Sequence, residues 1–134
     1  MEPQLHTVLL VEDAPFFRKM LGDYLRAMGF KNVVELPNGQ AALKHLEAAA
    51  RPDLVCLDLT LPDISGYDLC EHIRRKKGME DVPVLVVSAR DLPEDKAHAE
   101  EAGANSYLGK PFTQDEFSRR VGQLLKSAAA RRTS

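Results

Sequence analysis

Asp-Leu-Val-Cys-Leu-Asp-Leu-Thr-Leu-Pro-Asp-Ile-Ser-Gly, residues 53–66, decides how this sequence folds. Residues 54–57 form an unbroken apolar run, which is typical of a β-strand buried on both faces. The run ends at a carboxylate, Asp58, and a Leu-Pro-Asp turn follows. Ser65 and Asp68, three residues apart, form a capping pair that predicts the start of a helix. An acid at the carboxyl end of a buried strand lies where open α/β sheets bind ligands.

Apolar runs of the same kind recur on both sides of this stretch and alternate with segments of helical periodicity. The predicted strands are residues 6–11, 33–36, 54–57, 83–88 and 105–108. The predicted helices are residues 15–28, 39–50, 65–77, 93–102 and 113 to about 125. This alternation indicates repeated βα units, and therefore an α/β fold with a five-stranded parallel sheet and helices on both faces. The apolar stripe of the first helix, including Phe16 and Phe17, is assigned to the core.

Composition favours one globular domain and excludes several classes of protein. The 134 residues, 44% hydrophobic and 28% charged, predict a single domain over residues 1–127 and a flexible tail or linker stub over 128–134. A net charge of -2 and a pI near 6.1 give no basis for binding nucleic acid. The sequence has no apolar stretch long enough to span a membrane and no signal-peptide pattern, so we expect a cytoplasmic protein.

Polar side chains follow four of the predicted strands. Right-handed crossovers carry the carboxyl ends of parallel strands to the same edge of the sheet. That edge is predicted to collect Glu12, Asp13, Asp58, Ser88 and Lys110. Chance is a poor explanation for all five residues at one edge.

Three close carboxylates repel one another unless one is protonated or a cation lies between them. Oxygen ligands favour a hard cation, and Mg²⁺ tolerates a site completed by water and phosphate. A lysine and a hydroxyl beside the same acid indicate phosphoryl transfer to Asp58, with Lys110 neutralising phosphoryl oxygens and Ser88 donating to one of them. The alternative is structural: the acids cap loops and Lys110 forms a static ion pair.

The ordered set of motifs resembles the response-regulator receiver domain, the phosphoacceptor half of bacterial two-component signalling. The motifs are Glu12-Asp13, Asp58 with Leu61-Pro62 and Gly66, Ser88-Ala89, Tyr107, and Lys110-Pro111-Phe112. They extend over nearly the whole chain. The resemblance implies a flavodoxin-like, doubly wound sheet with strand order 2-1-3-4-5. Residues 11–18 are also similar to single-domain chemotaxis regulators.

The resemblance assigns roles to the residues at the phosphorylation site. It implies that Asp58 accepts phosphate from a histidine kinase or a histidine phosphotransfer protein. Mg²⁺ would be held by Asp13, Asp58 and the backbone carbonyl of Thr60, with Glu12 acting through water. Thr60 and Arg90 occupy variable positions that tune the lifetime of the phosphate, and a long Arg90 side chain would shield it for minutes or more.

The resemblance also implies a conformational switch. Ser88 would move toward the phosphoryl group and Tyr107 would rotate inward behind it, changing a surface around the fourth helix, fifth strand and fifth helix that binds a downstream protein. The Lys110–Pro111 peptide bond is expected to be cis. The protein would be a monomer or weak dimer that binds neither membranes nor nucleic acid.

Two other functions remain open at this point. The chain could be a protein-interaction module that uses the fold without being phosphorylated. It could also be a phosphatase that passes through an aspartyl phosphate, but such enzymes need a second acid two residues after the nucleophile, where this sequence has Thr60. A flavin or dinucleotide site would need a glycine-rich loop after the first strand, which this sequence lacks. We therefore expect a signalling phosphoacceptor rather than an enzyme.

Overall fold

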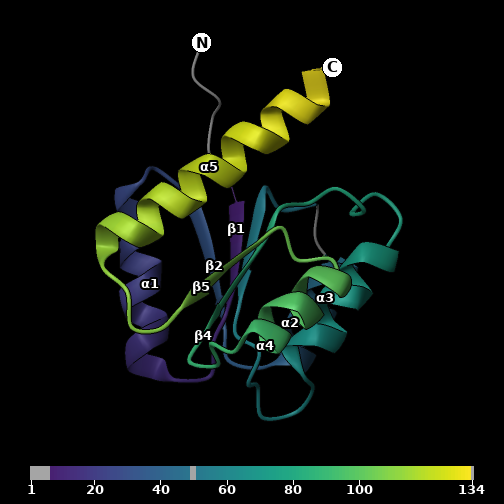
Figure 1. The fold of residues 1–134 in the computed structure, drawn as a ribbon. Coiled ribbons are helices and arrows are strands. Elements are labelled where there is room, and N and C mark those ends of the chain that lie inside the picture. The colour runs from purple at the N-terminus through teal and green to yellow at the C-terminus, as the bar shows by residue number, and fades with distance from the viewer. Residues whose placement is uncertain (1–6, 49–50, 134) are drawn as a thin grey trace.

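The computed structural model describes residues 7–48 and 51–133, in which strands and helices alternate (Figure 1). The strands are β1 (Thr7–Val11), β2 (Asn32–Leu36), β3 (Leu54–Leu57), β4 (Val84–Ser88) and β5 (Ser106–Gly109). The helices are α1 (Pro15–Ala27), α2 (Gly39–Ala48), α3 (Gly66–Arg75), α4 (Pro93–Glu101) and α5 (Gln114–Thr133). Within these described ranges, no helix is both long and apolar enough to cross a membrane.

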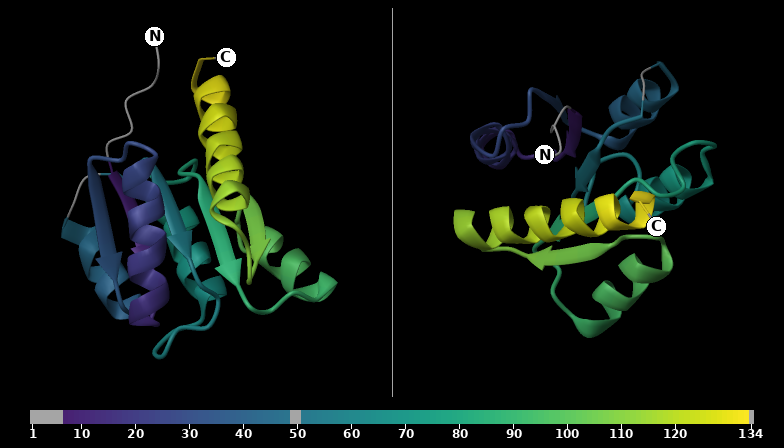
Figure 2. Two further views of the ribbon diagram at one scale, coloured as in Figure 1. Left: turned by 90° about the vertical axis from the view of Figure 1, so that its left-hand side faces the viewer. Right: turned by 90° about the horizontal axis from the view of Figure 1, so that it is seen from above.

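The five strands form one parallel sheet in the order β2-β1-β3-β4-β5, which confirms the predicted α/β fold and strand order. Helices α1 and α5 cover one face, and α2, α3 and α4 cover the other (Figure 2). The central strand β3 is paired on both sides, and each of its four residues is buried. Every strand points its carboxyl end to the same edge, where the predicted site residues lie.

Alternate residues of the buried strands supply two hydrophobic clusters, one on each face of the sheet. Leu9, Val55 and Val86 pack toward α2, α3 and α4. Leu10 and Val87 pack toward α1 and α5. This period of two is the signature of strands covered on both sides, so the continuous apolar runs in the sequence are explained by burial on both faces.

The element ends differ from the predictions in small ways. The first strand was expected from His6, which lies outside the described residues, as do residues 49–50 at the expected end of the second helix. Helix α3 ends at Arg75, before the predicted residue 77, because Lys76 already has an extended backbone with φ -75° and ψ 127°. None of these shifts moves a site residue.

Helix α5 is longer than predicted and continues through residues 128–133, which the sequence analysis assigned to a flexible tail or linker stub. The segment is helical because its three consecutive alanines have the highest helix propensity and no glycine or proline interrupts them. Ala128 is 8% exposed, so the extension begins against the domain. The domain boundary at residue 127 stays a prediction.

Phe16 does not belong to the core, contrary to the prediction for the first helix. Its side chain is 83% exposed, whereas Leu21 and Leu25 of the same helix are fully buried. The first turn of α1 lies at the carboxyl edge of the sheet, where no strand remains for Phe16 to pack on. Phe17 is half-buried, packs against the cluster under α1 and α5, and also contacts a residue of the functional site.

Gly66 lets helix α3 approach the end of β3 closely, and it fixes the turn that follows Asp58. A Cβ added at Gly66 would lie 2.4 Å from the Asp58 carbonyl oxygen and 2.6 Å from the Leu59 Cα. Because both atoms belong to the backbone, we expect Gly66→Ala to lower the free energy of unfolding by about 2 kcal/mol in urea denaturation. Gly122→Ala on α5 is the control, since nothing lies within 4 Å of its added Cβ. It should stabilise by about 0.5 kcal/mol, and equal effects of the two variants would contradict the argument.

Candidate phosphoacceptor site

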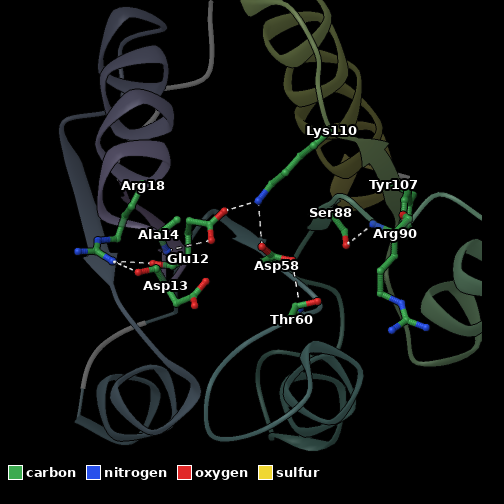
Figure 3. A network of polar contacts seen from close by, with 10 residues as sticks. All are labelled: Glu12, Asp13, Ala14, Arg18, Asp58, Thr60, Ser88, Arg90, Tyr107 and Lys110. Carbon is green, nitrogen blue, oxygen red and sulfur yellow. Dashed lines mark hydrogen bonds and ion pairs between the residues drawn. The ribbon is translucent and has the colours of Figure 1, made fainter.

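Three carboxylates meet at the carboxyl edge of the sheet. Glu12 and Asp13 follow β1, and Asp58 follows the neighbouring strand β3. Each offers one oxygen within 4.8 Å of the others (Figure 3). Glu12 is fully buried and Asp58 is 6% exposed, whereas Asp13 is exposed. The cluster therefore has two buried acids and one that faces solvent.

Lys110 bridges the two buried acids. Its Nζ donates to Glu12 Oε1 at 2.6 Å and to Asp58 Oδ2 at 2.9 Å. The lysine follows β5, two strands away from β3, so its long side chain crosses the edge of β4 to reach them (Figure 3). The Lys110–Pro111 peptide bond is cis, which is the isomer that the resemblance implied.

Burial and ion pairing act in opposite directions on the charges of this cluster. Burial, assisted by the charge of Asp58, raises the pKa of Glu12 even though the bond from Lys110 opposes it. Burial also disfavours the charged form of Lys110, but its bonds to Glu12 and Asp58 outweigh this effect and raise the pKa of Lys110. The site therefore favours the charged form of Lys110. For Glu12, the bond from Lys110 does not fully offset the effect of burial.

Backbone contacts fix the carboxylate of Asp58. Its own N–H donates to the Val11 carbonyl of β1 at 3.0 Å, which continues the ladder between β1 and β3 beyond the strand. The N–H of Thr60 donates to Asp58 Oδ1 at 3.1 Å. One oxygen of Asp58 thus accepts from the following loop, and the other accepts from Lys110.

Arg90 connects the hydroxyls of Ser88 and Tyr107. The N–H of Arg90 donates to Ser88 Oγ at 3.1 Å, and the hydroxyl of Tyr107 donates to the Arg90 carbonyl (Figure 3). Ser88 is fully buried at the end of β4, beside β3. The two residues predicted to switch therefore both bond to the backbone of Arg90, Ser88 to its N–H and Tyr107 to its carbonyl.

Asp95, an acid of α4 that was not predicted as a site residue, is buried and 4% exposed. Its carboxylate accepts from Arg90 Nε at 2.9 Å, from the Tyr67 hydroxyl at 3.3 Å and from the Leu92 N–H at 3.2 Å. Burial opposes its charge, but these bonds lower the pKa of Asp95 overall. An acid in a first helical turn resembles an ordinary cap, and no pattern of residues indicates that Arg90 reaches it. The predicted effect of Arg90 on phosphate lifetime stays a prediction.

Arg18 and Asp63 are two further polar residues that the sequence analysis did not single out. Arg18 donates from Nη1 to the Glu12 carbonyl at 2.7 Å, which ties α1 to the acidic loop. Asp63 accepts from the N–H groups of Gly39 and Gln40 at 2.8 and 2.7 Å, and so caps α2 from the loop after β3. Desolvation opposes the charge of Asp63, but backbone N–H donors, including those of Gly39, Gln40 and Ile64, lower its pKa overall. A cap supplied from more than twenty residues away leaves no local pattern in the sequence.

Comparison with known proteins places these features in a family. The sequence profile described as "Response regulator receiver domain" matches residues 8–122. The transcriptional regulatory protein KdpE of Mycobacterium tuberculosis is 40% identical over 129 residues, which are 95% of this chain and 52% of the relative. The chain spans about half the length of the curated relatives it matches.

Solved structures show the same architecture. A protein from Chloroflexus aurantiacus, crystallised as a response regulator, superimposes with a TM-score of 0.85 at 35% identity, covering 91% of this chain and 98% of its own. The response regulator TrrA from Thermotoga maritima, solved in complex with Mg²⁺ and BeF, gives a TM-score of 0.77 at 30% identity, with 90% and 99% covered.

Proposed function

The chain belongs to the response regulator receiver domain family, and on that premise we propose that Asp58 is its phosphoacceptor. Members of this family are signalling phosphoacceptors rather than enzymes that turn over a substrate. The observation that carries the proposal is the contact of Lys110 with Asp58 at 2.9 Å, inside a cluster with two other acids. The donor would be a histidine kinase or a histidine phosphotransfer protein, and small phosphodonors such as acetyl phosphate would also serve. A cytoplasmic location is part of this proposal.

Mg²⁺ fits the acid cluster by the chemistry of its donors. The cluster offers three carboxylate oxygens within 4.8 Å, and hard oxygen ligands of this kind suit Mg²⁺. Asp13 and Asp58 would hold the ion directly, with the Thr60 carbonyl as a third ligand and Glu12 acting through water. When bound, Mg²⁺ supplies positive charge to the phosphoryl oxygens. TrrA, solved with Mg²⁺ and BeF, supports this assignment.

The residues of this chain then act on the phosphoryl group as follows. A carboxylate oxygen of Asp58 attacks phosphorus, and the P–N bond of phosphohistidine, or the P–O bond of acetyl phosphate, breaks with its electron pair on the leaving group. Lys110 exchanges its bond to Asp58 for one to a phosphoryl oxygen. The N–H of Thr60, which already donates to Asp58 Oδ1, holds the carboxylate in place.

Phosphorylation of Asp58 would be transmitted to the surface of the protein through the backbone of Arg90. Ser88 Oγ accepts from Arg90 N–H before phosphorylation, and it would exchange this bond for one that donates to phosphate. That change would free the N–H of Arg90, whose carbonyl accepts from the hydroxyl of Tyr107. A pocket of about 440 Å³ between α4 and β5 includes Lys96, Glu100 and Tyr107 in its lining, so movement of Tyr107 would reshape a surface open to a downstream protein.

Phosphorylation by acetyl phosphate tests this proposal. With Mg²⁺, intact mass spectrometry should show the gain of one phosphoryl group, and EDTA should abolish the gain. Asp13→Asn removes one charged ligand, so its labelling rate should fall by about tenfold or more. Asp23→Asn, an exposed acid on α1, is the matched control and should label at the wild-type rate. Absence of labelling in the wild type, with no Mg²⁺ effect on its stability, would favour an unphosphorylated interaction module instead.

A further inference from the structure

The ammonium group of Lys110 has a third neighbour besides its two carboxylates. Its Nζ lies 4.1 Å from the centroid of the Phe17 ring, over the ring face. An ammonium group carries three N–H donors, and Glu12 and Asp58 accept two of them. The aromatic face attracts a cation through its quadrupole, so Phe17 completes the surroundings of the charge.

The ring of Phe17 is itself held in place by the hydrophobic core. It packs edge-on against Phe112, with ring centroids 5.8 Å apart, and Phe112 stacks on Phe117 at 5.7 Å. Phe117 is fully buried, which anchors this aromatic row in the cluster under α1 and α5. The side chain of Lys110 is 18% exposed, so little water competes with the ring for its charge.

The three neighbours of Lys110 differ in what phosphorylation would do to them. Asp58 would become an acyl phosphate, and Glu12 would turn its charge toward Mg²⁺ and its water. Both carboxylates would therefore interact less strongly with Lys110 during phosphoryl transfer, the step in which its positive charge is needed. The Phe17 ring carries no ligand for metal or phosphate, so its contact can persist through that step.

We propose that Phe17 is a positioning residue for phosphoryl transfer, which holds the Lys110 ammonium over the site while its carboxylate partners are redirected. This inference rests on the proposed function of Asp58 as phosphoacceptor. Phe17 does not touch the reacting atoms and acts through Lys110. Phe16 and Phe17 are adjacent in the first turn of α1. The Phe17 ring faces Lys110, whereas Phe16 is 83% exposed.

Matched aromatic substitutions on α1 test the inference. Phe17→Leu keeps an apolar side chain but removes the π face, so labelling by acetyl phosphate should slow by about fivefold. Phe17→Tyr keeps the face and should label at the wild-type rate. Phe16→Leu removes the neighbouring exposed ring and should also leave the rate unchanged. Urea denaturation of each variant establishes that it is folded, and loss of rate in Phe17→Tyr equal to that in Phe17→Leu would overturn the proposal.

A second readout does not depend on phosphorylation. Protons above an aromatic face resonate upfield, so the ε-methylene protons of Lys110 should be shifted upfield in the wild type, in Phe17→Tyr and in Phe16→Leu. The shift should vanish in Phe17→Leu. If the wild type is labelled and Phe17→Leu is labelled at the same rate, the role of Phe17 is refuted and the role of Asp58 is not. Failure of the wild type to label would refute the role of Asp58, while the NMR shift would still report the contact.

Discussion

Asp58→Asn is expected to take up no phosphoryl group from acetyl phosphate in the presence of Mg²⁺. The substitution keeps the shape of the side chain but replaces the carboxylate with an amide, which is not a nucleophile toward phosphorus at neutral pH. Labelling should fall by at least about 100-fold, to the background of a reaction without protein. Intact mass spectrometry measures the phosphoryl gain, and peptide mapping of the wild type should locate it on Asp58.

Asp91→Asn is the matched control for this prediction. Asp91 lies at the same edge of the sheet, after β4, but it is exposed and its carboxylate pairs with Lys96. The control variant should label at the wild-type rate. Labelling of Asp58→Asn at the rate of Asp91→Asn would place the phosphoacceptor elsewhere and refute the assignment.

Lys110→Met is expected to destabilise the protein by about 3 kcal/mol near pH 8, because it leaves two buried carboxylates without their counter-charge. The side chains of Glu12 and Asp58 are 1% and 8% exposed, so water compensates them poorly. Lys19→Met is the control, since Lys19 and its partner Asp23 are 75% and 55% exposed. An exposed pair of this kind contributes little, and the control should change stability by less than about 1 kcal/mol.

The effect of Lys110→Met should depend on pH in a defined direction. The pKa of Glu12 is raised in the folded protein above its ordinary value of 4.5. The free energy of unfolding therefore falls as pH rises from 4.5 through the pKa of Glu12 in the folded protein. Removing Lys110 raises that folded pKa further and extends the loss to higher pH. Urea denaturation should therefore show a small difference in the free energy of unfolding between variant and wild type near pH 5 and a larger difference near pH 8. Mg²⁺ should narrow the gap, and a gap independent of both would contradict this account.

The fold could be predicted from the sequence because the apolar runs and helical periodicities that indicate its strands and helices are local and repeated. Short apolar runs predicted each strand, and the strand order came from the family resemblance rather than from any run of residues. The helical extension after residue 127 was missed because an alanine-rich segment without an apolar stripe has propensity but no amphipathic pattern. Tertiary packing, rather than periodicity, decided that Phe16 would be exposed.

The composition of the site was predictable for a different reason. Parallel strands bring their carboxyl ends together, so Glu12, Asp58 and Lys110 were expected at one edge. The supporting contacts were not predictable, because each is a long-range pairing that depends on side-chain reach. Asp95 meets Arg90, and Phe17 meets Lys110, only once the helices are placed on the sheet.

The length of α5 has a mechanical consequence. Arg120 bonds to Ser106 Oγ and to the carbonyl of Tyr107, so the helix is fastened to β5 near its first third. Val121 and Leu124 are buried in the cluster under the helix and Ala128 is 8% exposed, so the packing of α5 continues past Arg120. Beyond Ala128 the helix extends about 8 Å further, at 1.5 Å per residue (Figure 1). A rearrangement of Tyr107 that shifted α5 would therefore be carried along the packed helix to an end about 20 Å from Arg120.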